Sequence, residues 1–287
     1  DGDGITDTLD VRIPGYNGDL MVLDDDIIRK DEPINIDKNP DGLMAVAIDL
    51  GFPIIRSDKL NITIYAQAAK MLGKTQDPDT GDEKPLGIGL IPFGVSSWFG
   101  PLHFIFEYRS IPEGKFEFSY WNRLYEIERV SFLRNNSNQV VLRTKESQLG
   151  KFGDQNGYFS RMSLDVGAFF EANMAYNNMV GSLWSNNDKK FILEKNQTFL
   201  TSLKLTKSIS RIQSASAFYQ QRNVPNPFKF KYTESTIIGC RLGISMGQGL
   251  VLNYIFRRTF RDYNANGRID GNAETIDITS IETSFTF

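Results

Sequence analysis

The chain has 287 residues, of which 40% are hydrophobic and 23% charged, a composition that excludes a disordered or collagen-like protein. The 32 basic and 35 acidic residues give a net charge of −3, without the basic excess that nucleic-acid binding needs. The single Cys240 excludes an intrachain disulfide framework and a cysteine-cluster metal site, and the single His103 excludes a histidine-rich metal centre. No run of 18 apolar residues is present, which excludes a transmembrane helix but not membrane-spanning strands, because these are apolar only at alternate positions.

Residues 1–41 form the first distinct stretch. They are acidic, rich in Gly, Asp and Pro, and lack a regular hydrophobic period, so we expect a long loop or arm rather than a domain. The sequence begins at Asp1 rather than Met and carries no signal peptide, as expected of a processed or truncated form.

From residue 42 onward the hydrophobic residues follow a period of two, which predicts β-strands. The clearest segments are 60–69 and the thirteen alternating residues 162–174. The latter would cross a bilayer as one strand, since about 9–11 tilted residues suffice. We expect strands at 43–54, 60–71, 86–98, 102–110, 115–126, 160–176, 197–206, 209–220, 235–246, 250–261 and 275–287.

The connections between these strands alternate in length. Short connections are expected at 56–59, 99–101, 206–208 and 247–249, and long polar ones at 73–85, 177–196, 221–234 and 262–274. Such alternation is typical of bacterial outer-membrane barrels, which have short periplasmic turns and long extracellular loops. We therefore predict an all-β fold in which residues 42–287 form a closed antiparallel transmembrane β-barrel of about twelve strands, within a range of ten to fourteen.

Two connections fit this order less well. Residues 111–114 are short where a long loop is expected, and residues 127–158 are long on the periplasmic side. The second segment contains two strand-like runs around Asn135–Asn138, which indicate a β-hairpin. It is either a periplasmic hairpin, an inward fold that narrows the lumen, or an extension of the wall.

The alternation also assigns side chains to two faces of the predicted barrel. The lipid face is expected to include Ile62, Ile64, Leu164, Val166, Phe170, Leu242, Ile244, Tyr254, Ile281 and Phe285. The lumen face is expected to carry Asp49, His103, Glu107, Arg109, Lys115, Glu117, Arg123, Arg161, Asp165, Glu171, Lys204, Arg211, Arg241, Arg257 and Glu282. Because both signs of charge are interleaved, this interior favours ion pairs and a narrow or closed path over a wide ion channel.

The last strand ends at the C-terminal Phe287, with Thr279, Ile281, Thr283 and Phe285 on one face. It resembles the C-terminal signal of Gram-negative outer-membrane β-barrel proteins, which the barrel-assembly machinery recognises. Thr at 279 and 283 departs from that pattern, where stronger apolar residues are usual. The resemblance implies location in the bacterial outer membrane, with its lipids and the barrel-assembly machinery as partners.

Residues 262–270 read Asp-Tyr-Asn-Ala-Asn-Gly-Arg-Ile-Asp and resemble the first nine positions of an EF-hand or dockerin calcium loop. Asp262, Asn264, Asn266, the Arg268 carbonyl and Asp270 would supply the oxygens, around a turn at Gly267. Ala273 stands where the bidentate acid is usual, and Glu274 follows one residue late. A structural Ca²⁺ site and a plain Asn/Asp-rich turn are both compatible with this sequence.

The N-terminal residues Asp1, Asp3 and Asp7 resemble the second half of a thrombospondin type 3 calcium repeat, whose first ligand would precede the chain. Missing upstream sequence would also supply a twelfth strand beside the eleven counted, since single-chain bacterial barrels have an even number. An acidic flexible N-terminus is the alternative.

Three functions are compatible with this barrel, and none of them identifies a solute or a partner. The first is a narrow pore or small-solute transporter, and the second is a structural or docking subunit that holds an envelope protein through its extracellular loops. The third is a calcium-dependent lipid-modifying enzyme, for which His103 is the only histidine and no nucleophile motif is present. A soluble β-sandwich is the alternative outside the membrane.

Overall fold

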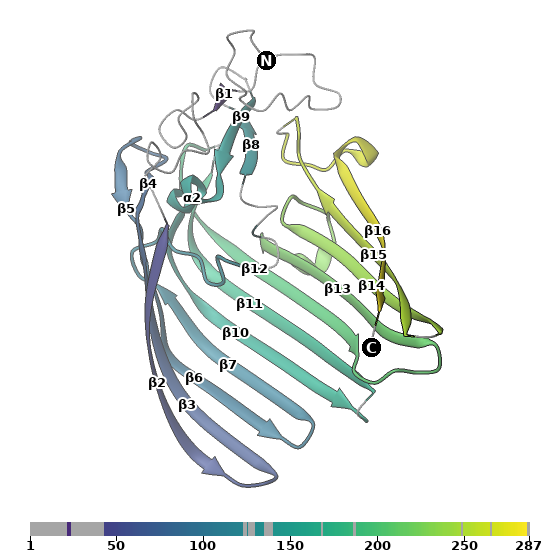
Figure 1. The fold of residues 1–287 in the computed structure, drawn as a ribbon. Coiled ribbons are helices and arrows are strands. Elements are labelled where there is room, and N and C mark those ends of the chain that lie inside the picture. Colours follow the sequence, from purple (N-terminus) through teal and green to yellow (C-terminus); the bar gives the residue numbers. More distant parts are fainter. Residues whose placement is uncertain are drawn as a thin grey trace.

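The computed structural model describes residues 22–23, 43–122, 125, 130–134, 140–167, 169–185, 188–247, 249–264 and 266–285. A curved antiparallel sheet of eleven strands dominates this part of the chain (Figure 1). The all-β prediction is therefore confirmed. The candidate residues Asp1, Asp3, Asp7 and Arg123, and the terminal Phe287, lie outside the described residues.

The eleven strands follow one another along the sheet in chain order, each antiparallel to its neighbours. They are β2 (Met44–Arg56), β3 (Leu60–Leu72), β6 (Ile88–Phe99), β7 (Leu102–Ile111), β10 (Phe152–Val166), β11 (Phe170–Ser185), β12 (Lys190–Leu205), β13 (Ile212–Val224), β14 (Thr236–Gly247), β15 (Leu250–Phe260) and β16 (Thr275–Phe285). Many exceed the ordinary strand length of about 5–6 residues.

Smaller elements gather at one end of the sheet. Three strands form a separate small sheet: β1 (Val22–Leu23), β8 (Val130–Arg134) and β9 (Val140–Thr144). A further pair comprises β4 (Lys74–Gln76) and β5 (Glu83–Pro85), and the short helices are α2 (Lys145–Gln148), η1 (Leu149–Lys151), η2 (Pro227–Lys229) and η3 (Gly271–Glu274). None of the helices in the described residues is long and apolar enough to cross a membrane.

The single strand expected over 160–176 is wrong, because β10 ends at Val166 and β11 begins at Phe170. Gly167 has a φ of 58°, which glycine adopts at little cost, and it opens a tight turn. Val166 lies directly opposite Phe170, so a turn of residues 167–169 leaves both side chains on the same face. The alternation therefore continues in phase through a hairpin. The long connection expected at 177–196 is wrong as well, since these residues extend β11 and begin β12.

The strand expected over 115–126 is also wrong. Residues 112–122, here called the inner segment, contain no strand, because left-handed conformations at Gly114, Lys115 and Ser119 interrupt the extended backbone. The inner segment packs inside the curve of the sheet, where Phe116 and Tyr120 join a core with Met71 and Met179. One expected strand is thus absent and another is two strands, so the two errors leave the count at eleven.

With these corrections the connections sort cleanly by side. The turns at 57–59, 100–101, 167–169, 206–211 and 248–249 lie at one end of the sheet, the turn end. The connections at 73–87, 112–151, 186–189, 225–235 and 261–274 lie at the other end, the loop end. The β8–β9 hairpin expected within 127–158 is confirmed, but this connection leaves and returns at the loop end, and residues 152–158 belong to the wall strand β10.

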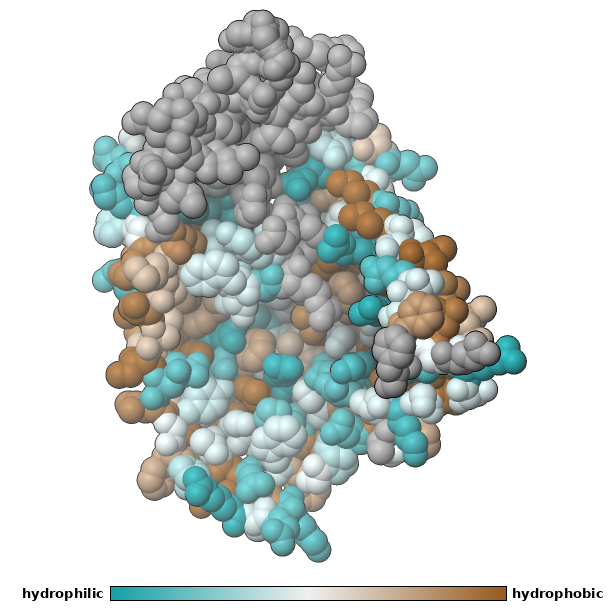
Figure 2. Space-filling model, viewed as in Figure 1, coloured by the Kyte–Doolittle hydropathy of each residue, from teal (hydrophilic) through white to brown (hydrophobic). Residues whose placement is uncertain are grey.

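The register separates the sheet into an outer face and an inner face, against which the inner segment packs. All ten residues expected on the lipid face lie together on the outer face. Asp49, His103, Glu107, Arg109, Asp165, Glu171 and Arg241 lie together on the inner face, as expected. Hydrophobic residues line both margins of the sheet in Figure 2, with polar residues across the hollow between them.

The two edge strands of the sheet are β2 and β16, and within the described residues they do not pair with each other. In this part of the chain the sheet is curved but not closed. Because every neighbouring pair is antiparallel, the first and the eleventh strand run in the same direction, from the loop end to the turn end.

Candidate functional site

The inner face of strands β10 to β13 forms one wall of a cavity of about 570 Å³, and the inner segment supplies Ser119 and Asn122 on another side. Its volume lies in the range of ligand-binding pockets. Most of the lining residues are polar, and those with amide or hydroxyl groups outnumber the charged ones; two phenylalanines also line the cavity. The lining comprises Ser119, Asn122, Phe159, Arg161, Glu171, Asn173, Ala175, Asn177, Thr198, Leu200, Ser202, Leu203, Lys204, Ser216, Ala217, Phe218, Gln220 and Arg222.

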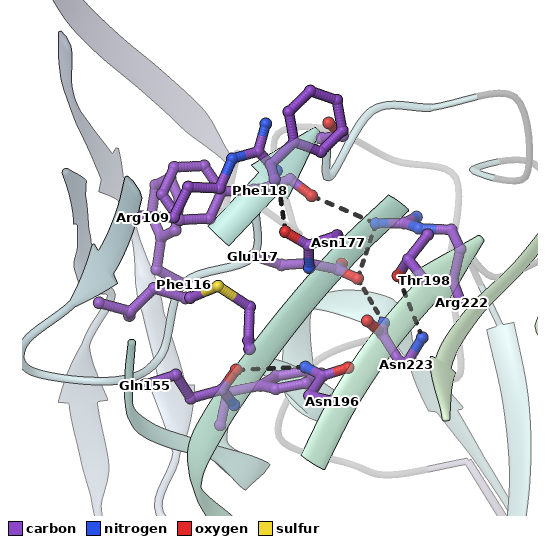
Figure 3. Close-up of a pocket in the computed structure, with 15 residues that line it drawn as sticks. Arg109, Phe116, Glu117, Phe118, Gln155, Asn177, Asn196, Thr198, Arg222 and Asn223 are labelled. Carbon is purple, nitrogen blue, oxygen red and sulfur yellow. Dashed lines mark hydrogen bonds and ion pairs between the residues drawn. The ribbon is translucent and has the colours of Figure 1, made fainter. Parts of the chain in front are cut away.

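Glu117 fixes the inner segment to the wall. Its carboxylate lies 2.9 Å from the Arg222 guanidinium of β13 and 3.4 Å from the Lys145 ammonium of α2, and all three side chains are buried. Arg222 also donates to the Phe118 carbonyl, and Asn223 donates to Glu117 (Figure 3). Burial raises the pKa of Glu117, but the attraction of Arg222 and Lys145 outweighs burial and holds that pKa below its ordinary value.

Arg109 of β7 fixes the inner segment from the other side. Its guanidinium carbon lies over the rings of Phe118 of the inner segment and Phe159 of β10, at 4.7 and 3.9 Å from their centroids. It also pairs with Glu107 at 2.6 Å and donates to Asn177 at 3.2 Å. Because its charge is matched by Glu107 and it contacts two aromatic rings, Arg109 joins three strands to the inner segment at a buried position.

Glycines allow the inner segment to approach the wall closely. A Cβ atom at Gly89 of β6 would lie 2.1 Å from the Phe116 ring, so only glycine leaves room for that ring. Next to it, the Gly87 amide donates to the Lys115 carbonyl at 2.9 Å and the Lys115 amide donates to the Phe152 carbonyl. These contacts hold Lys115 in its left-handed conformation.

A second cavity, of about 60 Å³, lies between the inner segment and the wall (Figure 3). It shares Ser119, Phe159, Asn177, Thr198 and Arg222 with the larger cavity, so the two adjoin. The buried Gln155 Nε2 and Asn196 Oδ1 lack hydrogen-bond partners there, although Asn196 Nδ2 donates to Gln155 Oε1 at 3.3 Å. A cavity of this size with an orphaned donor and acceptor has room and partners for a few water molecules. Together the cavities form a polar track that narrows beside Glu117.

The loop at 261–274 places most of the predicted calcium ligands close together. The Asp262 carboxylate accepts from the Asn266 and Gly267 amides, and the Asn266 side chain bonds both Asp270 and the Arg268 amide. Glu274, which the sequence places one residue late, is buried and accepts from the Asn264 and Asp270 amides. The side chains of Asp262, Asn266, Asp270 and Glu274 carry oxygen atoms, which are the ligands that Ca²⁺ prefers.

Other observations limit what this loop can do. No group of three or more His, Cys, Asp or Glu in the described residues is arranged to hold a metal ion. The Asp262 amide donates to Glu234 at 3.2 Å, and burial raises the pKa of Glu234 to about 7. In the structure the loop is therefore a turn held by its own hydrogen bonds, and Ca²⁺ binding by it stays a prediction.

His103 has a partner that was not predicted from the sequence. Its Nε2 lies 3.0 Å from Ser96 Oγ, across the β6–β7 hairpin, and its ring stacks on Trp98 at 3.8 Å between centroids. In the described part of the chain no carboxylate is bonded to the other ring nitrogen of His103. The pair therefore lacks the third group that orients a catalytic base. Cys240 lies on the outer face of β14, opposite Phe256.

Mixed charge on the inner face is matched in pairs, as the alternating signs predicted: Glu107 with Arg109, Glu117 with Arg222, and Arg241 with Glu282 at 3.9 Å. Glu117 and Lys115, however, occupy the inner segment rather than a wall strand. What the site offers is a polar track with a fixed constriction and no nucleophile activated for catalysis among the described residues. No protein-family model matches this sequence, and no curated protein is significantly similar to it.

Proposed function

We propose that the chain forms the greater part of an outer-membrane β-barrel that acts as a narrow pore for small solutes. One observation carries the proposal: the same strands bear an apolar outer face and a polar inner face that surrounds a fixed inner segment. A large exposed apolar surface on a sheet requires a non-aqueous partner, and a bilayer covers such a surface completely. Four of the five connections at the loop end are longer than any at the turn end, the exception being 186–189, and this asymmetry supports the same orientation as in outer-membrane barrels.

Closure of the barrel is part of this proposal. Unpaired backbone groups cost several kcal/mol each in hydrocarbon, so the edges at β2 and β16 need partners in a bilayer. Because β2 and β16 run in the same direction, an odd number of further strands completes an antiparallel ladder. One such strand gives a barrel of twelve.

Conductance across planar bilayers tests the pore. We expect small steps from the purified protein, and larger steps when residues 115–120 of the inner segment are replaced by a Gly-Ser linker. The matched control replaces residues 78–81, which lie in the exposed β4–β5 connection, and should leave the conductance unchanged. Absence of conductance in all three proteins would exclude the pore, and extraction from cells without detergent would exclude the membrane location.

The outer-membrane lipids and the barrel-assembly machinery are the partners in this proposal. Deletion of Phe287 should greatly reduce insertion in cells, whereas Phe285→Ala, which alters an outer-face residue but keeps the terminal one, should reduce it little. Equal insertion of the two variants would contradict recognition of the terminal residue.

A docking subunit is the second candidate. It is favoured by the elements at the loop end, where β4–β5, β8–β9 and the loop at 261–274 all lie at the same end of the sheet (Figure 1). In this proposal Ca²⁺, bound by Asp262, Asn264, Asn266, Arg268 and Asp270, orders one of these connections for an envelope partner. Co-purification of a partner in calcium, and its loss in a chelator, would support this function over the pore. The enzyme hypothesis is the weakest, since Ser96 and His103 lack an orienting acid.

A further inference from the structure

The larger cavity carries more positive than negative charge, although the whole chain carries a net charge of −3. Its lining contains Arg161, Lys204 and Arg222 but only one carboxylate, that of Glu171. Lining groups of one sign in a low-dielectric cleft concentrate the field and attract solutes of the opposite sign.

Two of the three cations have acidic neighbours. Arg222 is paired with Glu117 at 2.9 Å, and Lys204 lies directly opposite Glu171 in the register of β11 and β12. The Glu171 carboxylate also accepts a hydrogen bond from Asn173 at 2.8 Å. Asp165 lies opposite Glu171 on the other side, outside the cavity lining.

Arg161 differs from both. Its register neighbours are Ile105 on β7 and Ala175 on β11, neither of which carries charge. In the described part of the chain no carboxylate lies within ion-pair distance of Arg161, and its side chain is exposed to the cavity. An arginine that lies on a polar surface and has no carboxylate partner can bind an oxyanion, because its guanidinium donates two parallel hydrogen bonds.

The side chain of Asn177, which lines the same cavity as Arg161, can also donate hydrogen bonds. The Asn177 carbonyl oxygen already accepts a hydrogen bond from Arg109, which leaves its amide hydrogens for the cavity that Asn177 lines. The hydroxyls of Thr198 and Ser202 line the same cavity from β12, the strand next to β11 in the sheet. A compact oxyanion therefore finds a cation and neutral donors on the same surface.

We propose that the larger cavity binds small oxyanionic solutes, such as phosphate or a short carboxylate, with Arg161 as the anchoring residue. The inference rests on the proposed pore, because it names the class of solute that the pore admits from the turn end. The cavity lies between the turn end and the inner segment, so a solute that enters from the turn end meets Arg161 before it reaches the narrow part of the track beside Glu117.

The test uses the full chain purified in detergent, with Arg161→Gln and Arg161→Glu. The matched control is Arg257→Gln, which removes an arginine from the same inner face on β15, outside the cavity lining. Titration calorimetry with inorganic phosphate and with acetate, without added lipid, measures binding apart from transport. We expect affinity to fall about tenfold or more in Arg161→Gln and to remain unchanged in Arg257→Gln.

Bilayer recordings in a salt gradient then measure ion selectivity. Wild-type protein should prefer anions, Arg161→Gln should lose most of the preference, and Arg161→Glu should reverse it. Conductance without anion preference, or the same preference in all variants, would overturn the oxyanion site and leave the pore intact. If the protein does not conduct but binds anions in a way that depends on Arg161, the pore is overturned and the site is kept. If neither anion binds at millimolar concentration, the site is overturned.

Discussion

Glu117 and Arg222 are 105 residues apart in the chain and form a 2.9 Å ion pair inside the curved sheet. Lys145 adds a second cation at 3.4 Å. The Glu117 carboxylate thus balances two buried cations, and its removal takes away the negative charge that both of them approach.

Glu117→Gln should lower the free energy of unfolding by about 3–5 kcal/mol, because uncompensated buried charges are costly. Glu113→Gln, in the same inner segment but exposed, should change it by less than about 0.5 kcal/mol. Urea unfolding in detergent micelles measures both values. A small effect of Glu117→Gln would mean that the inner segment is held by its aromatic contacts alone.

Acid should weaken the same contact. The pKa of Glu117 is lower in the folded protein than in the unfolded chain, where glutamate titrates at about 4.3. Its stabilisation is therefore complete above that value and is lost as the pH falls through the folded pKa. The difference in unfolding free energy between wild type and Glu117→Gln should be constant from pH 8 to 5 and should shrink below about pH 4. A difference that persists at the lowest pH would contradict this assignment.

Gly89→Ala should displace Phe116 and destabilise the inner segment by about 1–3 kcal/mol, the usual cost of overpacking. Gly51→Ala, on the neighbouring part of the wall, should be tolerated, because its Cβ would meet only Thr63 at 3.9 Å. The double variant Gly89→Ala, Phe116→Ala should be less destabilised than the sum of the single changes. Strict additivity in thermal unfolding would show that the ring does not occupy this space.

The two faces of β11 should respond differently to charge. Met174→Arg places a cation on the outer face and should cost about 2–4 kcal/mol in lipid vesicles. Asn173→Arg places the same charge on the inner face beside Glu171 and should cost much less. Equal costs for the two variants would show that the outer face does not contact lipid.

The loop at 261–274 should bind Ca²⁺ weakly, with a dissociation constant of about 10⁻⁴ to 10⁻³ M, because few of its ligands are charged. Asp262→Asn and Glu274→Gln should each weaken binding further, and Asp79→Asn, in the exposed connection between β4 and β5, should leave it unchanged. Calorimetry that detects no heat from the wild type at millimolar Ca²⁺ would leave a turn held by its own hydrogen bonds.

The sequence predicts the faces of the sheet well because polarity acts on each residue separately. Each residue of a strand in the sheet points to the apolar or to the polar side, so the alternation of apolar and polar residues indicates the face even where the predicted strand boundaries are wrong. That is why Leu164 and Glu171 are on the predicted faces although the predicted single strand is a hairpin. The turn at Gly167 leaves no break in the alternation.

The inner segment could not be predicted in the same way. Residues 115–120 alternate charged or polar residues with aromatic ones, as an amphipathic strand does. What removes them from the wall is a set of distant contacts, from Gly89 to Phe116 and from Arg222 to Glu117. The Ser96–His103 pair is different, because both residues flank the turn at 100–101, and pairing across that hairpin was available from the sequence.

The turn at 167–169 has an odd number of residues and keeps Val166 and Phe170 on the same face, which also affects how such a sheet can evolve. A hairpin whose turn preserves both faces, such as β10–β11 (Phe152–Ser185), can be duplicated or lost as one genetic unit without changing the polarity pattern of its neighbours. Each event changes the circumference by two strands and leaves the two edge strands parallel to each other. A lineage can thus widen or narrow this sheet stepwise while its outer face and its inner face stay compatible.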